Sequence, residues 1–329
     1  MKKRSFLRRF AGLALVGVFG LGIGASAAAQ SKEIVYLAPG LDLPFWRYVL
    51  QGVKSVADQN GYDFRVLDSR NRAQTQLKNA QDAIARGADG IVLSPTDSST
   101  APSVLKLAKE HDVPVVIADI GTDEGDYASF IISDNYQGAK GVGEELAAAL
   151  KERGWGDGSI GIVAISQARQ NGRARTKGFR DGLKAGGIDI KEAGMRQMQS
   201  YTAEETFRFV QDMLTSNPDM HGLFVQTDRP TIGALRALKA ARRSDDVLVA
   251  AFDGVPEFID YIKSGEIVVS GMQQPFLMGQ RSAEAMVKKL EGNGTPEKKI
   301  TVPIQVVTSG NIDKLLPTIK KTVFANELE

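Results

Sequence analysis

Short apolar runs alternate with helical patterns along this 329-residue chain, and this alternation restricts its fold more than any other feature. The runs that we predict as strands are 34–37, 63–67, 91–93 and 115–118, and then 160–163, 222–225, 247–250 and 267–269. We predict a helix that begins at about Pro44 after the first strand. The other predicted helices cover 74–86, 103–110, 173–186, 203–216, 230–242, 256–263 and 276–290. The strands are mostly apolar throughout, which is typical of parallel strands covered on both faces. The pattern therefore predicts an α/β protein built of βαβ units.

The alternation occurs twice, so we expect two doubly wound, Rossmann-like lobes rather than one large domain. A short strand before Ser133, Asp134 and Asn135 marks the first crossing between the lobes. Ligands of open parallel sheets bind beyond the carboxyl ends of the strands, and a cleft between two lobes is a common site for a small molecule. Polar residues that directly follow a predicted strand are therefore the candidates for binding.

The first residues have the pattern of a secretory signal peptide. A basic start is followed by an apolar stretch from Phe10 to Ile23 and by an A-x-A cleavage pattern that ends near Ala29. The alternative is a membrane anchor, but the apolar stretch is shorter than the ~20 residues that span a bilayer. Cleavage near Ala29 removes five basic residues and no acidic one, so the formal net charge of +2 becomes −3. We expect a soluble protein in the periplasm.

The composition excludes several kinds of chemistry. The chain has no cysteine and two histidines, His111 and His221. It therefore has no disulfide, no thiolate nucleophile and no cysteine-based metal site, and a Ser-His-Asp triad would need one of these two histidines. No basic patch that would favour nucleic acid remains after the signal peptide. We predict no catalytic residue, no bound metal and no cofactor.

Several segments, taken in order, resemble the periplasmic sugar-binding proteins of ABC importers, of the ribose-binding type within the type I periplasmic binding proteins. The segments that carry this resemblance are 43–46, 95–98, 113–119, 133–135, 173–179, 233–238 and 252–254. The resemblance extends from about Glu33 to Val307. It implies a first lobe of 30–134 plus 274–305 and a second lobe of 135–273 plus 306–329, joined by a multi-strand hinge. The hinge residues that it implies are Ser133, Asp134, Asn135 and Gln274.

The same resemblance implies which residues bind the ligand. They are Phe45, Trp46, Asp119, Arg173, Tyr201, Thr227, Asp253 and Gln273. Aromatic rings would cover the apolar faces of a sugar, while carboxylates and a guanidinium group would make charge-assisted hydrogen bonds to its hydroxyls. The sequence departs from the ribose-binding pattern at Leu43, Ile120 and Thr227, where that pattern has Asn, Arg and Asn. We therefore expect a polyhydroxy ligand that is smaller, less polar or differently arranged than ribose.

These positions also have structural interpretations. The aromatic pair could pack in the core at a helix start, Asp119 could cap a turn, and Tyr201 could pack at an edge. Arg173 could pair with Asp181 on its own helix, and Asp253 precedes Gly254 as in many turns.

Three functions compete. A binding protein that closes about a hinge and delivers a sugar-like solute to an importer permease fits the resemblance best, and a monomer is then expected. A periplasmic receptor module could instead present a hydroxylated signal molecule to a sensor kinase or a chemoreceptor. An exported enzyme could use Asp119 and Asp253 as an acid–base pair, although no histidine or cysteine joins them.

Overall fold

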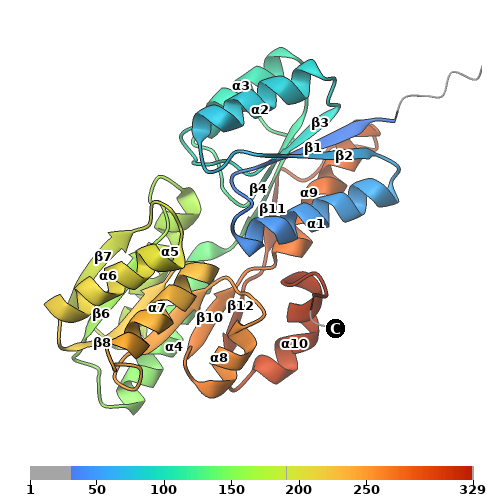
Figure 1. Ribbon diagram of the computed structural model, residues 1–329. Helices are drawn as coiled ribbons and strands as arrows, with labels where there is room; N and C mark the ends of the chain where they lie inside the picture. The colour runs from blue at the N-terminus through green and yellow to red at the C-terminus, as the bar shows by residue number, and fades with distance from the viewer. Residues whose placement is uncertain (1–30, 190, 328–329) are drawn as a thin grey trace, which may run out of the picture. The chain divides into compact units, whose positions relative to one another are not determined.

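The computed structural model describes residues 31–189 and 191–327. The signal peptide predicted over 1–29 lies outside the described residues. Within the described ranges, none of the helices combines the length and the apolar character that a membrane crossing requires. The described chain forms two six-stranded sheets, each with helices on both of its faces (Figure 1). This arrangement confirms the predicted α/β class with two mainly parallel sheets.

The first sheet has the strand order β11-β5-β4-β3-β1-β2, and all of its neighbouring strands are parallel. Its strands are β1 (Glu33–Ala38), β2 (Asp63–Asp68), β3 (Gly90–Leu93), β4 (Val115–Ala118), β5 (Ser129–Ser133) and β11 (Lys299–Val302). Helices α1 (Pro44–Gln59) and α9 (Pro275–Leu290) pack together, as do α2 (Ala73–Ala85) and α3 (Ala101–Glu110). The central strands are fully buried because these two helix pairs cover opposite faces (Figure 1).

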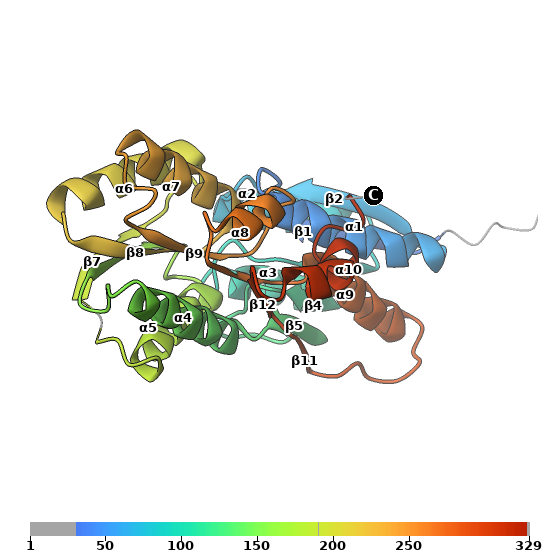
Figure 2. The ribbon, with the colours of Figure 1, turned by 90° about the horizontal axis from the view of Figure 1, so that it is seen from below.

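The second sheet has the order β12-β10-β9-β8-β6-β7, in which only β12 is antiparallel to its neighbour. Its strands are β6 (Ser159–Ala164), β7 (Lys191–Gln197), β8 (Met220–Val225), β9 (Leu248–Phe252), β10 (Val269–Met272) and β12 (Gln305–Thr308). Its helices are α4 (Asn135–Glu152), α5 (Gln170–Ala185), α6 (Ala203–Ser216), α7 (Asp228–Ala240), α8 (Phe258–Ser264) and α10 (Ile312–Thr322). Helices α4 and α5 lie on one face, and α6 and α7 on the other (Figure 2).

The chain passes between the two sheets three times. The passages run from β5 to α4, from β10 to α9, and from β11 to β12. Asp134 caps α4 by accepting the backbone N–H of Gln137 at 3.1 Å. The side chain of Gln274 donates to the carbonyl of Pro303 at 2.7 Å, so the second and third passages are bonded to each other. The lobe boundaries and the hinge residues stay predictions.

Most predicted strands and helices lie within one or two residues of the observed ones, but several elements were not predicted. Strand β7 has the polar sequence KEAGMRQ, because it is an edge strand whose side chains are largely exposed. Strands β11 and β12 have four residues each and are only partly buried, so they show no continuous apolar run. Helix α10 was not predicted either, and it contains Pro317.

Helices α1 and α9 touch through two glycines. A Cβ on Gly52 would overlap the carbonyl oxygen of Phe276, and one on Gly279 would overlap that of Val49. These atoms belong to helix backbones, so they cannot move aside as a flexible side chain would. The two helices can therefore pack this closely only because both positions lack a side chain.

We expect Gly52→Ala to lower the free energy of unfolding by about 1–3 kcal/mol, because overpacking outweighs the better helix propensity of alanine. Urea unfolding would measure this change. Gly141→Ala on α4 is the matched control, since its Cβ would meet mainly a methyl group of Val306. Equal stability of the two variants would contradict the assigned backbone contact.

Candidate functional site

Strands of both sheets end at one cavity in the described part of the chain, and polar residues closely follow four of them. Asp119 follows β4, Thr227 lies just beyond β8, Asp253 follows β9 and Gln273 follows β10. The cavity is lined by Leu43, Phe45, Trp46, Asp119, Ile165, Arg169, Asn171, Arg175, Tyr201, Thr227, Asp253 and Gln273. Seven of the eight predicted binding residues are in this set, and Arg173 is not. The walls therefore come from the carboxyl ends of strands in both sheets, as expected for an α/β ligand site.

The cavity is narrow and adjoins a wider one. Its free volume is about 20 Å³, close to the space that one water molecule needs. The wider cavity has a volume of about 940 Å³ and shares Leu43, Trp46, Arg169 and Tyr201 with the narrow one. A sugar-sized molecule therefore fits between the inner walls only when they move apart.

Arg175 holds the polar side of the cavity together. Its guanidinium group donates to Asn135 Oδ1 at 2.8 Å and to the carbonyl of Gln226 at 2.7 Å, and it pairs with Asp253 Oδ2 at 3.3 Å. The same group stacks over the buried ring of Phe252, 4.1 Å from the ring centroid. A buried arginine with this many partners has one fixed position, so it offers the cavity a preorganised charge.

Asp253 is the second centre of this network. Its carboxylate accepts Thr227 Oγ1 at 2.9 Å and Gln273 Nε2 at 2.7 Å, in addition to Arg175. Because the amide nitrogen of Gln273 is bonded to Asp253, its carbonyl oxygen remains available. Thr227 and Gln273 thus line the cavity and also hold the Asp253 carboxylate in place.

Three residues of the cavity wall have left-handed backbone conformations. The φ angles are 68° for Asp119, 62° for Asp253 and 56° for Tyr201. Aspartate tolerates this region, but a tyrosine does so only at a cost of about 1–3 kcal/mol. Each residue follows shortly after a strand, and the turn directs its side chain toward the cavity.

The cavity has buried acceptor oxygens that are not bonded to any described residue. They are Asp119 Oδ1, Asn171 Oδ1 and Gln273 Oε1. Asp119 and Asn171 are also bonded to each other, with Asn171 Nδ2 donating to Asp119 Oδ2 at 2.8 Å. A buried polar atom without a partner costs about 1–3 kcal/mol, so these oxygens are positioned for donors that come from outside the described chain.

Burial changes the protonation of two carboxyl groups. The pKa of Asp119 is raised to about 6, mainly because the group is desolvated; the charge of Arg175 opposes this rise and the charge of Asp253 adds to it. The pKa of Asp228 is raised to about 7 by burial and then by the charge of Asp253. Asp228 lies at the start of α7 and does not line the cavity. Its Oδ1 accepts the backbone N–H of Arg229 at 2.6 Å.

The aromatic wall comes from two elements. Phe45 and Trp46 begin α1 and pack edge to face, with ring centroids 4.8 Å apart. Tyr201 lies between β7 and α6, and its hydroxyl accepts the backbone N–H of Ser166 at 3.2 Å. The guanidinium group of Arg169 stacks on the Tyr201 ring, 5.1 Å from the centroid. The three rings are buried, so each contributes apolar surface inside the site.

Arg173 lies outside the cavity. It is half exposed, it donates to the carbonyl of Gln167 at 2.8 Å, and it lies 3.8 Å from Asp123. Asn171 and Arg175, on the same helix, line the cavity instead. The helical period could have identified them, because both lie on the buried stripe of α5 that includes Phe179 and Gly182, whereas Arg173 does not.

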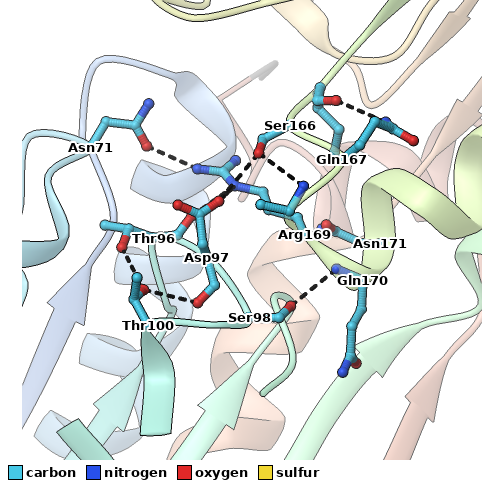
Figure 3. A network of polar contacts seen from close by, with 12 residues as sticks. Asn71, Thr96, Asp97, Ser98, Thr100, Ser166, Gln167, Arg169, Gln170 and Asn171 are labelled. Carbon is cyan, nitrogen blue, oxygen red and sulfur yellow. Dashed lines mark hydrogen bonds and ion pairs between the residues drawn. The ribbon is translucent and has the colours of Figure 1, made fainter. Parts of the chain in front are cut away.

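Arg169 connects the loops of the two sheets (Figure 3). Its Nε donates to the carbonyl of Thr96 at 2.9 Å, and its NH2 group donates to Asn71 Oδ1 at 2.8 Å. Thr96 and Asn71 belong to loops of the first sheet, whereas Arg169 directly precedes α5 of the second. The Arg169 side chain is almost fully buried in this position.

Neighbouring residues add further bonds between these loops (Figure 3). Ser166 Oγ donates to Asp97 Oδ1 at 3.3 Å, and the backbone N–H of Gln170 donates to Ser98 Oγ at 3.0 Å. We call the bonds made by Ser166, Arg169 and Gln170 to the first sheet the Arg169 clasp. Sequence reasoning missed it because these contacts exist only when the two sheets are together.

Among the described residues, no cluster of three or more His, Asp or Glu side chains is arranged to hold a metal ion. The site is instead a set of hydrogen-bonding groups beside aromatic rings. Such a set can bind a small polar molecule without changing it.

Comparison with known proteins agrees with this description. The periplasmic binding protein domain family matches residues 34–294. The ribose import binding protein RbsB of Haemophilus influenzae is 31% identical over 296 residues, which cover 90% of this chain and 98% of that protein. The D-apiose import binding protein of Paraburkholderia graminis is 31% identical, over 88% of this chain and 92% of that protein. The crystal structure of the Caulobacter myo-inositol binding protein with myo-inositol superposes with a TM-score of 0.79 at 26% identity, covering 88% of this chain and 98% of that chain.

Proposed function

Because the chain belongs to the periplasmic binding protein family, whose members are binding proteins and not enzymes, we propose that it captures a sugar or a sugar-like polyol for an ABC importer. The proposed partner is the importer permease in the inner membrane, and the proposed state is a monomer. The proposed compartment is the periplasm, reached by the signal peptide that ends near Ala29. The mass of the protein recovered from a periplasmic fraction would test that cleavage, and a full-length chain would contradict it.

The unpartnered acceptors of the cavity carry this proposal. Asp119, Asn171 and Gln273 each have a buried oxygen that needs a donor, and a polyol is a ring or chain of O–H donors. Hydrogen bonds to charged groups contribute about 1.5–3 kcal/mol each, and those between neutral groups about 0.5–1.5 kcal/mol. The rings of Phe45 and Trp46 can cover the C–H face of the same molecule.

The relatives support the ligand class but name different members of it. Their names or titles give ribose, D-apiose and myo-inositol, which share hydroxyl groups and differ in ring size and arrangement. Leu43 brings an apolar side chain to the cavity. We therefore propose a polyhydroxy ligand that is less polar than ribose on that side or arranged differently.

The proposed mechanism is closure of two lobes about a hinge. We assign 30–134 plus 274–305 to the first lobe and 135–273 plus 306–329 to the second. Ser133, Asp134, Asn135 and Gln274 lie at the passages between the sheets and are the proposed hinge. The inner cavity is too narrow to admit a sugar unless its walls separate, which supports such a motion. Moving the equilibrium from 1:99 to 99:1 requires a ligand that binds the closed state more tightly by ~5.5 kcal/mol.

The first test is a thermal-shift screen of pentoses, hexoses, furanoses and inositols, followed by calorimetry of the compounds that stabilise the protein. A ligand at 100 times its dissociation constant adds about 2.7 kcal/mol of stability. We expect at least one polyol to raise the melting temperature and to be recovered unchanged. A complete screen without a stabilising compound would reject the proposed function.

We expect Arg169→Ala to weaken binding of that polyol about 10- to 100-fold, because the variant loses two bonds of the closed form. Calorimetry would give the affinity, and small-angle scattering at saturating ligand would report the closed fraction. Arg180→Ala is the control, since Arg180 lies on the surface of α5 and pairs with Glu192 in its own sheet. Unchanged affinity and an unchanged scattering profile of Arg169→Ala would contradict the role of the clasp.

A further inference from the structure

Asp119 is a carboxylate of the cavity wall that has no cationic partner among the residues that the structure describes. Asp253 pairs with Arg175 at 3.3 Å, and Arg169 lies 3.9 Å from Asp97. Throughout 31–189 and 191–327, no basic side chain forms an ion pair with Asp119. Within these ranges, the side chain that is bonded to it is the neutral amide of Asn171. The next residue, Ile120, is buried and apolar, so it brings no charge to the site.

A buried carboxylate in this situation is destabilised in its charged form. Asp119 is only 1% exposed, and desolvation is the largest cause of its raised pKa of about 6. A ligand cation in contact with this carboxyl group would favour its ionised form and compensate the buried charge.

The geometry of the acceptors indicates what compensates this charge. Asp119 Oδ1 and Asn171 Oδ1 both lack a partner among the described residues, and the two side chains are bonded to each other. An ammonium group has three N–H donors, no acceptor and one positive charge. Such a group at Asp119 Oδ1 can donate a hydrogen bond and balance the carboxylate at the same time, and its other N–H groups remain for further acceptors such as Asn171 Oδ1. A hydroxyl has one donor and leaves the charge unbalanced.

Neither Arg169 nor Arg175 donates to the unpartnered oxygens of Asp119 and Asn171. Arg175 is committed to Asn135, Gln226 and Asp253, and Arg169 to Thr96 and Asn71. Their charges still act on Asp119 from a distance and oppose a ligand cation. The contact with Asp119 must outweigh this repulsion, and electrostatic attraction is strongest in a direct contact because it falls with distance.

We propose that the ligand is an amino-substituted sugar or polyol whose ammonium group binds between Asp119 and Asn171. This inference rests on the proposed function, since it specifies the ligand class of the same cavity. The remaining hydroxyls of the ligand face Gln273 and the aromatic wall, as they would in a neutral polyol.

Calorimetry at pH 7.5 with matched pairs of compounds tests this inference. The pairs are D-glucose and D-glucosamine, D-ribose and 2-amino-2-deoxy-D-ribose, and myo-inositol and its monoamino derivatives. We expect at least one amine to bind about tenfold or more tightly than its hydroxyl counterpart, because an ammonium group brings a positive charge that compensates Asp119 and three donors, whereas a hydroxyl brings one donor and no charge. In Asp119→Asn this preference should disappear, because the amine loses the compensated charge as well as a hydrogen bond and therefore loses more affinity than its hydroxyl counterpart.

Asp123→Asn is the matched control, because Asp123 is a half-exposed carboxylate near the second sheet that does not line the cavity. The Asp123→Asn variant should prefer the amine as strongly as the natural protein does. If every amine binds more weakly than its counterpart, or if Asp119→Asn weakens both members of a pair equally, the inference is overturned while the polyol function stands. If no compound of either kind binds in this experiment or in the complete thermal-shift screen, both are rejected.

Discussion

Arg175→Ala should reduce the affinity for the polyol at least about 100-fold, whereas Arg173→Ala should change it less than about threefold. The two arginines are two positions apart on α5 and point to different surroundings. Arg175 is buried against Asn135 and Asp253, and Arg173 is half exposed beside Asp123. Removing Arg175 leaves Asp253 charged, buried and without its cation, so the site loses both a donor and its fixed shape.

The same substitution should destabilise the fold by about 3–5 kcal/mol, which is the usual cost of removing one partner of a buried ion pair. Binding must therefore be measured on protein shown to be folded by circular dichroism and thermal melting. Arg175→Lys keeps the charge but loses the forked geometry, and we expect it to recover part of the stability and little of the affinity. If Arg173→Ala abolished binding and Arg175→Ala did not, the residue implied by the family resemblance would be upheld against the structure.

Asp228→Asn should stabilise the protein at high pH by up to about 4 kcal/mol. Burial and the charge of Asp253 raise the pKa of Asp228 from 3.8 to about 7. The folded state therefore holds a proton that the unfolded state releases between these two values. The contribution of Asp228 is most favourable below about pH 4, and it is lost as the pH rises through 7. Asparagine has no such loss, because it carries no charge to bury.

Urea unfolding at pH 4, 6 and 8 would measure this effect as the difference between the variant and the natural protein. We expect a difference near zero at pH 4 that grows toward pH 8. Asp212→Asn, at an exposed position of α6, is the control and should show a flat difference. A flat profile for Asp228→Asn as well would show that Asp228 titrates as an exposed carboxyl group does.

Sequence patterns predicted the parts of the fold that depend on local residue order. The central strands are continuous apolar runs because helices cover both of their faces, and the site residues Asp119 and Asp253 directly follow such runs. The edge strand β7 is polar because one side of it meets solvent. Its position in the sheet had to be known before its sequence could be interpreted.

The arginines at and just before the start of α5 show a second limit of prediction from the sequence. Arg169, Arg173 and Arg175 are chemically alike, and the family resemblance favoured Arg173. Which arginine reaches the cavity depends on the residue at which the helix begins and on which face packs against α4. A shift of two residues turns a side chain by more than half a helical turn, which is enough to move it from the cavity to the surface. The role of Arg169 depends on loops of the other sheet, which no local pattern contains.

Each sheet combines strands from distant parts of the sequence, and this strand order limits when the protein can fold during its synthesis. Helix α9 and strand β11, which complete the first sheet, come from the last fifth of the sequence, although the rest of that sheet ends at Ser133. A nascent chain that stops before Pro275 lacks the backbone against which Gly52 is packed, so its first half has an uncovered apolar face. Neither sheet can finish assembling until almost the entire polypeptide has been synthesised, and long-range closure of this kind slows folding.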